Sequence, residues 1–474
     1  MMKTHRTTLA CSLLAAVGST AFAQPCSPIE SQIIVADDGD VGDGYGWSVD
    51  IDGDTAVVSA INEDAAGFDS DSGSIYVLEF DGSSWDQTQK LVPIGIGPAD
   101  RVGNCVAIDD DTIVIGASGD DDAGSGAGAA YVYTKVNGTW TQTTKLVPPM
   151  LVGGDNCASA VDIDNDTIIL SASLTDTHGF NSGAAYIYRK IKGEWTFEAQ
   201  LFSDDIAEFD RFGKDVSVSG NRALISADSD DDNGPTSGSA YIFERSGTTW
   251  TQTAKLIASD GDPDDQFGEC VSLSGSTALI GSRYDNVLGG NSGSAYIFEY
   301  DGSQWQEQIK LFPLDGTSSE YFGQNVAIHN NRAVIGAWGV DDPFGFFNAG
   351  AAYIYSRTNG AWSLDRKIIA SDQEGSDFFG YGVGITDDHA IIGADGNDDF
   401  WWGPDAGAVY MIDLNCAVQC PADLTNDGSL NFLDVSAFLT AFGNQDPIAD
   451  FESDGSFNFL DVSAFLAAFG AGCP

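Results

Sequence analysis

Short apolar stretches separated by polar turns fill most of the chain, and their lengths suit β-strands rather than helices. Residues 255–309 show the pattern once in full, with turns rich in Gly, Asp, Ser and Asn between the stretches. The stretches are CVSLS (270–274), TALIG (277–281), SAYIFEY (294–300) and WQEQIKLF (305–312). No helical spacing of apolar residues interrupts them. The pattern therefore predicts four β-strands in this part of the chain.

The same four-strand pattern recurs through the middle of the chain at an almost constant period. Its third strand carries a tyrosine in every copy, at steps of 55 or 57 residues: Tyr76, Tyr131, Tyr186, Tyr241, Tyr296, Tyr353 and Tyr410. A tryptophan opens the fourth strand with the same step: Trp85, Trp140, Trp195, Trp250, Trp305 and Trp362. Because each copy has these rings at the same phase, we expect them in the core of each repeat. Seven copies of four strands predict an all-β fold, a seven-bladed β-propeller.

The two ends of the repeated region predict how the ring of blades closes. The seventh copy has its tyrosine strand, AGAVYMIDL (406–414), but no tryptophan strand follows it, whereas residues 32–40 (QIIVADDGD) are similar to that missing strand. We expect the N-terminal strand to complete the seventh blade, which removes an exposed sheet edge. That pairing brings Cys26 close to Cys416, and a disulfide between them would stabilise the closure by about 2–5 kcal/mol.

The pattern changes in the last part of the chain, where apolar residues take a helical spacing and the sequence repeats itself. NDGSLNFLDVSAFLTAF (426–442) returns 27 residues later as SDGSFNFLDVSAFLAAF (453–469). Each copy has an apolar face at i, i+3, i+4 and i+7: Val435, Phe438, Leu439 and Phe442, then Val462, Phe465, Leu466 and Phe469. The faces end at Gly443 and Gly470. Two such helices can bury these faces against each other.

Each predicted helix follows a loop whose oxygen-bearing residues have the spacing of a calcium site. Positions 1, 3, 5, 7, 9 and 12 are Asp423, Thr425, Asp427, Ser429, Asn431 and Asp434 in the first copy, and Asp450, Glu452, Asp454, Ser456, Asn458 and Asp461 in the second. Gly428 and Gly455 stand at position 6, where such a loop turns sharply. Ca²⁺ accepts mixed carboxylate, amide and carbonyl oxygens, so we expect one ion in each loop. The alternative, two polar turns before unrelated helices, does not account for the duplication.

No helix precedes either loop, because Pro421 and Pro447 lie just before them. Segment 420–474 thereby resembles a type I dockerin, a duplicated calcium-loop-and-helix domain. The resemblance implies a small all-α domain that binds two Ca²⁺ ions and docks onto a cohesin-like secreted or surface protein. Positions 10 and 11, which help to choose the partner in that family, are Phe432-Leu433 and Phe459-Leu460 here, where the family often has polar residues. A calcium-stabilised module with no partner is the alternative.

An aromatic residue followed by glycine opens most of the propeller repeats. The pairs are Phe212-Gly213, Phe267-Gly268, Phe322-Gly323 and Phe379-Gly380, and Gly-Ala pairs recur in the second strand at 116–117, 336–337 and 393–394. These features resemble FG-GAP repeats, the blades of integrin α-subunits and of many bacterial secreted proteins. The first three copies depart from the pair, with Tyr45-Gly46, Val102-Gly103 and Cys157-Ala158. The resemblance implies a binding or adhesion platform.

Alternate aspartates follow two of these openings, at Asp50, Asp52 and Asp54 and at Asp162, Asp164 and Asp166. They match part of an integrin calcium loop but lack its glycine and its last carboxylate. A tight hairpin turn is therefore favoured over a metal site at both places.

The N-terminus and the charge indicate where the protein acts. Residues 1–23 have Lys3 and Arg6, an apolar stretch from Leu9 to Val17, and Ala21 and Ala23 before the expected cut, as in a secretory signal peptide. The net charge of −51 argues against a nucleic-acid partner. No later apolar stretch is long enough for a membrane helix. We expect a protein that is secreted or held at the surface, with a propeller at 24–416, a link at 417–419 and the dockerin-like domain at 420–474.

Seven cysteines follow the signal peptide, in a compartment that permits disulfides. Cys420 and Cys473 bracket the duplicated domain, and we expect them to pair. Of the three cysteines within the repeats, at most two can pair with each other. Cys105 and Cys157 lie in neighbouring repeats and are the predicted pair.

Aromatic residues that break the repeat mark a candidate binding site for a glycan or a protein. They lie between the second and third strands of the last two copies, where other copies have small polar residues: Trp338, Phe344, Phe346 and Phe347, and Phe400, Trp401 and Trp402. Aromatic side chains on neighbouring loops could stack on a sugar or dock a protein. A local hydrophobic cap over these blades is the alternative.

Motifs for catalysis are missing from the sequence. His178, His329 and His389 lie in three different repeats, and there is no G-x-S-x-G elbow, zinc spacing or phosphate loop. We therefore expect a non-catalytic binding protein. The alternative is a propeller glycosidase or lyase, carried to a complex by the C-terminal domain and acting at the same aromatic residues.

Overall fold

The computed structural model describes residues 29–64, 72–341, 347–397 and 406–414, and, toward the C-terminus, residues 422, 424, 432–444, 449, 451 and 457–471. The chain forms two compact units, and the boundary between them follows Cys416. The first unit contains the strands and the second contains the two helices. None of the helices in the described residues has the length and apolar character needed to cross a membrane.

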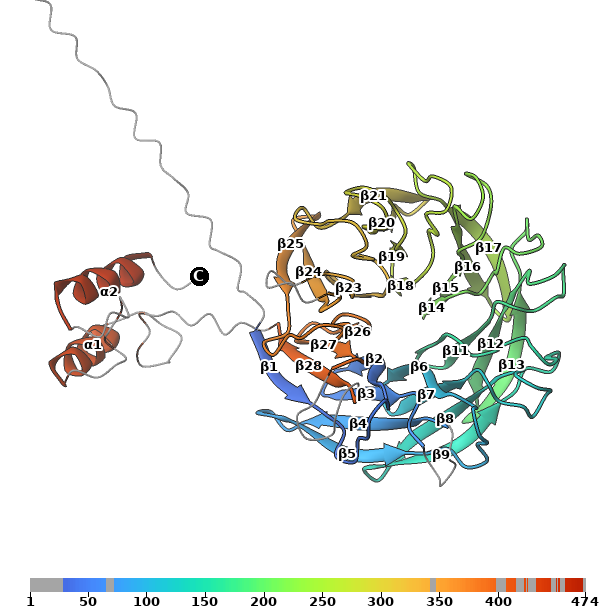
Figure 1. Ribbon diagram of the computed structural model, residues 1–474, viewed down its shortest axis with the longest axis horizontal. Coiled ribbons are helices and arrows are strands. Elements are labelled where there is room, and N and C mark those ends of the chain that lie inside the picture. The colour runs from blue at the N-terminus through green and yellow to red at the C-terminus, as the bar shows by residue number, and fades with distance from the viewer. Residues whose placement is uncertain are drawn as a thin grey trace, which may run out of the picture. The chain divides into compact units, whose positions relative to one another are not determined.

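Seven four-stranded antiparallel sheets surround a central axis, as Figure 1 shows. Blade 1 consists of β2 (Tyr45–Asp52), β3 (Thr55–Ala60), β4 (Ser74–Phe80) and β5 (Trp85–Leu91). Blade 2 consists of β6 (Val102–Asp109), β7 (Thr112–Ala117), β8 (Ala129–Val136) and β9 (Thr139–Leu146). Blade 3 consists of β10 (Val161–Asp164), β11 (Thr167–Ala172), β12 (Ala184–Ile191) and β13 (Glu194–Leu201). Blade 4 consists of β14 (Val216–Ser219), β15 (Arg222–Ala227), β16 (Ser239–Ser246) and β17 (Thr249–Leu256). Blade 5 consists of β18 (Val271–Ser274), β19 (Thr277–Ser282), β20 (Ser294–Tyr300) and β21 (Trp305–Leu311). Blade 6 consists of β22 (Val326–His329), β23 (Arg332–Ala337), β24 (Ala351–Thr358) and β25 (Ala361–Ile368). The predicted seven-bladed propeller is confirmed.

Blade 7 joins the two ends of the repeated region. It contains β26 (Val383–Ile385), β27 (His389–Ala394), β28 (Ala408–Asp413) and the N-terminal strand β1 (Ile29–Ile34), in the order β1-β28-β27-β26. Ile33 of β1 lies opposite Tyr410 of β28. The predicted closure is therefore confirmed, although β1 begins and ends earlier than expected. Cys26, Cys416, Cys420 and Cys473 lie outside the described residues, and their two disulfides stay predictions.

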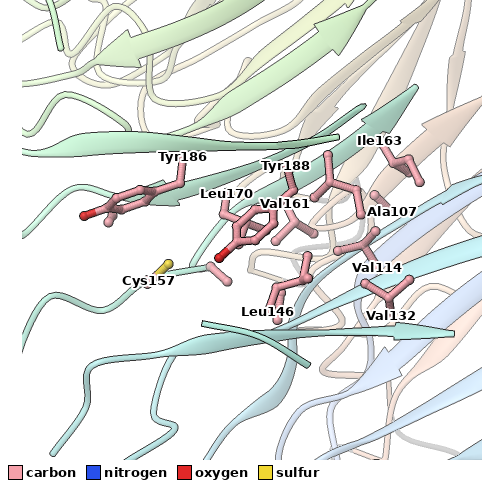
Figure 2. Packing of buried hydrophobic residues seen from close by; sticks show 14 of the residues in the cluster. Ala107, Val114, Val132, Leu146, Cys157, Val161, Ile163, Leu170, Tyr186 and Tyr188 are labelled. Atoms are coloured by element: carbon pink, nitrogen blue, oxygen red, sulfur yellow. The ribbon is translucent and has the colours of Figure 1, made fainter. Parts of the chain in front are cut away.

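The hydrophobic core lies between neighbouring blades. Figure 2 shows the part between blades 2 and 3, where Val114 and Val132 of blade 2 face Val161 and Leu170 of blade 3. The seven repeated tyrosines are buried, with at most 1% of each exposed, which confirms that they form the core. Alternation within each strand sends one set of side chains to each neighbouring blade.

Cys105 and Cys157 are both free thiols, so the predicted disulfide between them is wrong. Cys157 is fully buried in the interblade core, at the place where later copies have phenylalanine. The sulfur of Cys105 lies 3.8 Å from the carbonyl oxygen of Val161. Burial raises the pKa of the Cys105 thiol to about 12. Both thiols are therefore packed as small apolar groups.

The aromatic-glycine openings join each blade to the one before it. The Phe212 amide donates to the carbonyl of Ser182 at 3.0 Å, and its ring is fully buried. Gly183, which precedes β12, has φ +90°, and a Cβ there would lie 2.0 Å from the Phe212 carbonyl oxygen. Parallel bridges of the same kind join Gly293 to Phe322 and Gly350 to Phe379. The repeated glycine before the tyrosine strand thus allows two blades to approach at backbone distance.

The second unit contains two helices, α1 (Phe432–Asn444) and α2 (Phe459–Ala471). The rings of Phe438 and Phe465 stack with centroids 4.1 Å apart, and Phe451 meets both edge-on. The helices thus bury equivalent positions of the duplication against each other. Leu439 and Leu466 were predicted to lie on the same apolar faces, but they are 59% and 55% exposed.

Candidate ligand-binding face of the propeller

A channel runs through the propeller, and the first strand of each blade lines it. The connections between blades, and those between second and third strands, open on one side, which we call the loop face. On this side each blade contributes the residue that follows its aromatic-glycine pair, or the pair's equivalent. These residues are Trp47, Asn104, Ser159, Lys214, Glu269, Gln324 and Tyr381. They line a cavity of about 160 Å³.

Charged side chains of blades 4 and 5 meet at this end of the channel. Oε1 of Glu269 accepts a hydrogen bond from Nζ of Lys214 at 2.9 Å and lies 3.2 Å from Nη1 of Arg283. Although burial opposes charge here, Lys214 and Arg283 hold the pKa of Glu269 below its ordinary value. Arg283 also donates to Oε1 of Gln324 at 2.7 Å. The loop face therefore has fixed charges of both signs beside a hydrogen-bonding amide.

Six half-buried aromatic residues continue around the mouth through blades 5, 6, 7 and 1. We call them the aromatic arc: Tyr284, Tyr321, Trp338, Phe378, Tyr381 and Trp47. Tyr321 and Trp338 stack with ring centroids 4.6 Å apart and planes 8° from parallel, and Phe378 lies edge-on to Trp338 at 5.5 Å. Across the next blade boundary, Trp47 lies 4.8 Å from Tyr381. Nε1 of Trp338 reaches Oε1 of Gln324 at 3.4 Å, which links the arc to the charged side chains.

The sequence-predicted aromatic patch is described only in part. Trp338 belongs to the arc, whereas Phe347, on the β23–β24 connection, is 72% exposed. Phe344, Phe346, Phe400, Trp401 and Trp402 lie outside the described residues. The role of the patch in binding stays a prediction.

Sequence reasoning missed the other five members of the arc. Tyr321 and Phe378 stand directly before the repeated phenylalanines, and Trp47 and Tyr381 follow the repeated glycines, so none of the four interrupts the repeat. The variation among the seven copies at single positions of the repeat could have identified them. The residue after each aromatic-glycine pair differs in every copy, whereas the glycine before it recurs in six copies and a valine two positions after it recurs in all seven. A position that varies within an otherwise uniform repeat faces something other than the common core.

Among the described residues, carboxylates line the opposite end of the channel, and they have a structural role. Asp50 accepts a hydrogen bond from the Ile108 backbone amide at 2.8 Å, and Asp162 accepts one from the Val218 backbone amide at 2.7 Å. Each donor belongs to the inner strand of the following blade, which has no strand partner on that side. The aspartates thus satisfy amides at the inner edge of the sheets.

These carboxylates line a larger cavity of about 810 Å³ together with serines of blades 4 and 5 and His329. Burial, with mutual repulsion, raises the pKa of Asp50 to about 8 and that of Asp162 to about 7. Hydrogen bonds from backbone amides oppose this shift only in part.

The alternate aspartates lie in hairpins, as the sequence favoured. Asp52 pairs with Thr55 across the β2–β3 turn, and Asp164 pairs with Thr167 across the β10–β11 turn. In the described part of the chain, no group of three or more His, Cys, Asp or Glu side chains is arranged to hold a metal ion.

Three of the predicted calcium ligands lie among the described residues of the second unit. Asp434 and Asp461, at position 12 of each loop, are fully buried in the first turns of α1 and α2. The Asn458 amide donates to Asp461 at 2.8 Å. Two buried carboxylates at equivalent places in the duplication fit the oxygen-only chemistry of Ca²⁺. Asp423, Thr425, Asp427, Ser429, Asn431, Asp450, Glu452, Asp454 and Ser456 lie outside the described residues.

The closed ring of seven four-stranded blades defines the protein as a seven-bladed β-propeller. The FG-GAP repeat matches it at residues 29–78, 85–133, 140–188, 195–243, 250–298, 305–355 and 362–412, and the chain belongs to this family. No curated protein matches the sequence. Each matched segment begins in the outer strand of one blade and ends in the third strand of the next. The sequence repeat is thus offset from the blade by one strand.

Proposed function

We propose that this protein is a secreted, non-catalytic binding or adhesion protein that holds its ligand at the loop face of the propeller. The observation that carries the proposal is the aromatic arc, in which four adjacent blades place six half-buried rings around one mouth of the channel. Rings that are held in place by one another lose little side-chain freedom when a ligand covers them, which favours binding.

The groups beside the arc suit recognition of a polar ligand. Gln324 and Arg283 offer a hydrogen-bond acceptor and donors beside the rings of Trp338 and Tyr284. Stacking on aromatic faces, combined with a few placed polar groups, is how proteins bind the face of a sugar or an aromatic anchor of another protein. Both a glycan and a protein loop fit this description.

A binding experiment with the full chain tests the arc. Immobilised protein is offered a panel of polysaccharides and the extracellular proteins of the source organism. We expect Trp47→Ala and Trp338→Ala to weaken retention of the bound species at least tenfold. The matched control is Phe180→Ala, which removes an exposed ring paired with Phe209 away from the arc. Equal loss in the control, or no loss in either arc variant, contradicts the proposal.

We further propose that the second unit is a calcium-dependent, dockerin-like anchor for a cohesin-like protein. The duplicated loop-and-helix sequence, the symmetric stacking of Phe438 on Phe465, and the buried Asp434 and Asp461 support this role. Phe459, at position 10 of the second loop and 78% exposed, offers an apolar contact for the partner.

Retention of a cohesin domain by the full chain, with calcium and with a chelator, tests the anchor. We expect binding only with calcium, and loss of binding in Phe459→Asp with the fold of the unit intact by circular dichroism. Asp301→Asn, on an exposed propeller hairpin, serves as the control. If the unit folds with calcium but retains no cohesin, it acts as a calcium-stabilised module without this partner.

A further inference from the structure

Three places in each blade surround the mouth of the channel on the loop face, and their charge differs from that of the chain. They are the residue before the aromatic-glycine pair or its equivalent, the residue after it, and the residue that follows the second strand. Over the seven blades these places carry four basic residues, Arg101, Arg211, Lys214 and Arg283, and three acidic ones, Asp228, Glu269 and Asp395. The whole chain has 20 basic and 71 acidic residues. A strongly acidic protein thus concentrates basic residues around this mouth.

Three of these basic side chains are open to solvent, whereas their acidic partners are buried. Nη1 of Arg211 lies 3.1 Å from Oδ2 of Asp228, and 35% of the Arg211 side chain is exposed against none of Asp228. Glu269 pairs with Lys214 and Arg283, and 4% of its side chain is exposed against 24% for each of these partners. A ligand at blades 4 and 5 therefore meets the cations of these pairs rather than the carboxylates.

The exposed cations lie directly beside the aromatic arc. The guanidinium of Arg283 lies 4.6 Å from the ring centroid of Tyr284. Its Nη1 donates to Oε1 of Gln324 at 2.7 Å, and Nε1 of Trp338 reaches the same oxygen at 3.4 Å. Lys214 lines the same cavity of about 160 Å³ as Gln324. A ring that stacks on the arc therefore has positive charge beside it, on the side of blades 4 and 5.

A carboxylate at blade 7 opposes these cations across the arc. Asp395 is half-buried, and burial together with its negative charge raises the pKa of the Tyr381 hydroxyl, while Arg283 acts in the opposite direction. Both charges are thus close enough to act on this member of the arc. An anionic group is attracted at blades 4 and 5 and repelled at blade 7, which gives an acidic ligand one favoured orientation.

The side chains around the mouth favour a sugar over a protein. Among the residues at the three places in each blade, Ile61 is the only aliphatic one, and it is buried. The exposed groups are aromatic rings, amides, hydroxyls and charges. The centre of a protein interface is mostly apolar, whereas a sugar presents a C–H face to an aromatic ring and hydroxyl groups to the polar side chains around it.

We propose that the loop face binds an acidic glycan, whose sugar rings stack on the aromatic arc while its carboxylates contact Arg283 and Lys214. The inference rests on the binding function proposed above for the loop face and names the class of ligand. Hydrogen bonds between charged partners are stronger than those between neutral ones. The net charge of −51 does not prevent such binding, because charges more than roughly 8 Å away are largely screened at physiological ionic strength.

Calorimetric titration of the full chain with oligosaccharides of galacturonate, alginate and hyaluronan tests this inference. Each oligosaccharide is compared with its methyl ester, which keeps the sugar rings and loses the carboxylate charge. We expect at least one acidic oligosaccharide to bind with a stoichiometry of one per chain, and its ester to bind at least tenfold more weakly. This comparison uses the natural chain, so it does not depend on the folding of any variant.

Substitutions at the mouth then locate the charge effect. Arg283→Gln and Lys214→Gln are each expected to weaken binding of the acidic oligosaccharide at least fivefold and to leave the weak binding of the ester unchanged. Asp395→Asn removes the opposing carboxylate, and we expect it to strengthen binding of the acidic form about twofold to fivefold. The matched control is Lys192→Gln, which removes one positive charge from the exposed β12–β13 turn, on the side opposite the loop face.

The outcomes separate this inference from the function on which it rests. If esters or neutral glycans bind as tightly as the acidic forms, or if a protein is retained instead, and Trp338→Ala abolishes that binding, the loop-face function stands and the acidic ligand is overturned. Acidic oligosaccharides that bind equally well to Trp338→Ala and Trp47→Ala contradict stacking on the arc, and with it both proposals. Absence of binding by every acidic oligosaccharide overturns the inference alone, because the retention experiment with extracellular proteins still tests the loop-face function.

Discussion

Aspartates of the channel perform two tasks that have opposite effects on stability. Asp50 and Asp162 accept amides of the next blade and so complete the inner edges of the sheets. Their burial near one another also makes their charge costly, which raises the pKa of Asp50 to about 8. The proton is therefore bound more tightly by the folded chain than by the unfolded chain, where an aspartate has a pKa of about 3.9.

The stability of the propeller is consequently expected to fall as the pH rises from about 5 to about 7. In this range the folded state holds more protons than the unfolded state, so each such carboxylate contributes a loss of roughly 1 kcal/mol per pH unit. Thermal unfolding across this range measures the slope. The double variant Asp50→Asn, Asp162→Asn removes both titrating groups, and we expect a shallower slope.

Asp301→Asn is the control for this experiment, because Asp301 lies in an exposed hairpin and caps the turn to Ser303. It is expected to keep the slope of the natural chain. An unchanged slope in the channel variant would show that other groups set the pH dependence.

At the scale of the element, the junction between blades depends on glycine at one place in each repeat. Gly183 and Gly193 have the same φ of +90°, but a Cβ at Gly183 meets the Phe212 backbone, whereas nothing lies within 4 Å of one at Gly193. The two glycines thus differ in their surroundings and not in their φ. Comparing the same substitution at these two glycines therefore separates the cost of backbone strain from the cost of a clash between two blades.

Alanine substitution at both glycines tests this difference by urea unfolding. Gly193→Ala is expected to cost about 1–2 kcal/mol, because only the left-handed backbone is penalised. Gly183→Ala carries the same penalty and must also push β12 away from blade 4, so we expect a loss at least about 2 kcal/mol larger. Similar losses for both variants would mean that the blades can separate at little cost.

At the scale of the whole molecule, the two units are expected to respond differently to calcium. The loops before α1 and α2 supply the predicted ligands, and the small core around Phe438 and Phe465 is too limited to fold strongly without them. Differential scanning calorimetry of the full chain should show one transition that a chelator lowers and one that it leaves unchanged. Asp434→Ala with Asp461→Ala is expected to abolish the calcium shift, whereas Asp301→Asn retains it. A propeller transition that also moves would point to calcium bound within the blades.

The fold could be predicted from the sequence because the same four-strand pattern occurs seven times. Tyr76 and its six equivalents fixed the period, and the missing last strand then located β1. The candidate site could be predicted only in part. Trp338 could be identified because it breaks the repeat, whereas Tyr321 and Phe378 occupy a position at which the repeat accepts many different residues. The packing of blade 6 against blade 7 brings these side chains together, and no local sequence pattern predicts that contact. The Cys105–Cys157 pairing was wrong because neighbouring repeats need not bring equivalent surfaces together.

The order of strands in blade 7 also determines how the molecule bears a pulling force. The chain leaves the propeller from β28, which is hydrogen-bonded to β1 on one side and to β27 on the other. Tension applied through the C-terminal segment, as in an adhesion protein held at one end, must therefore break two ladders of hydrogen bonds at once. An outermost strand would instead break only one ladder. The pairing of β1 with β28 that closes the ring thus also protects β28 against the pulling force.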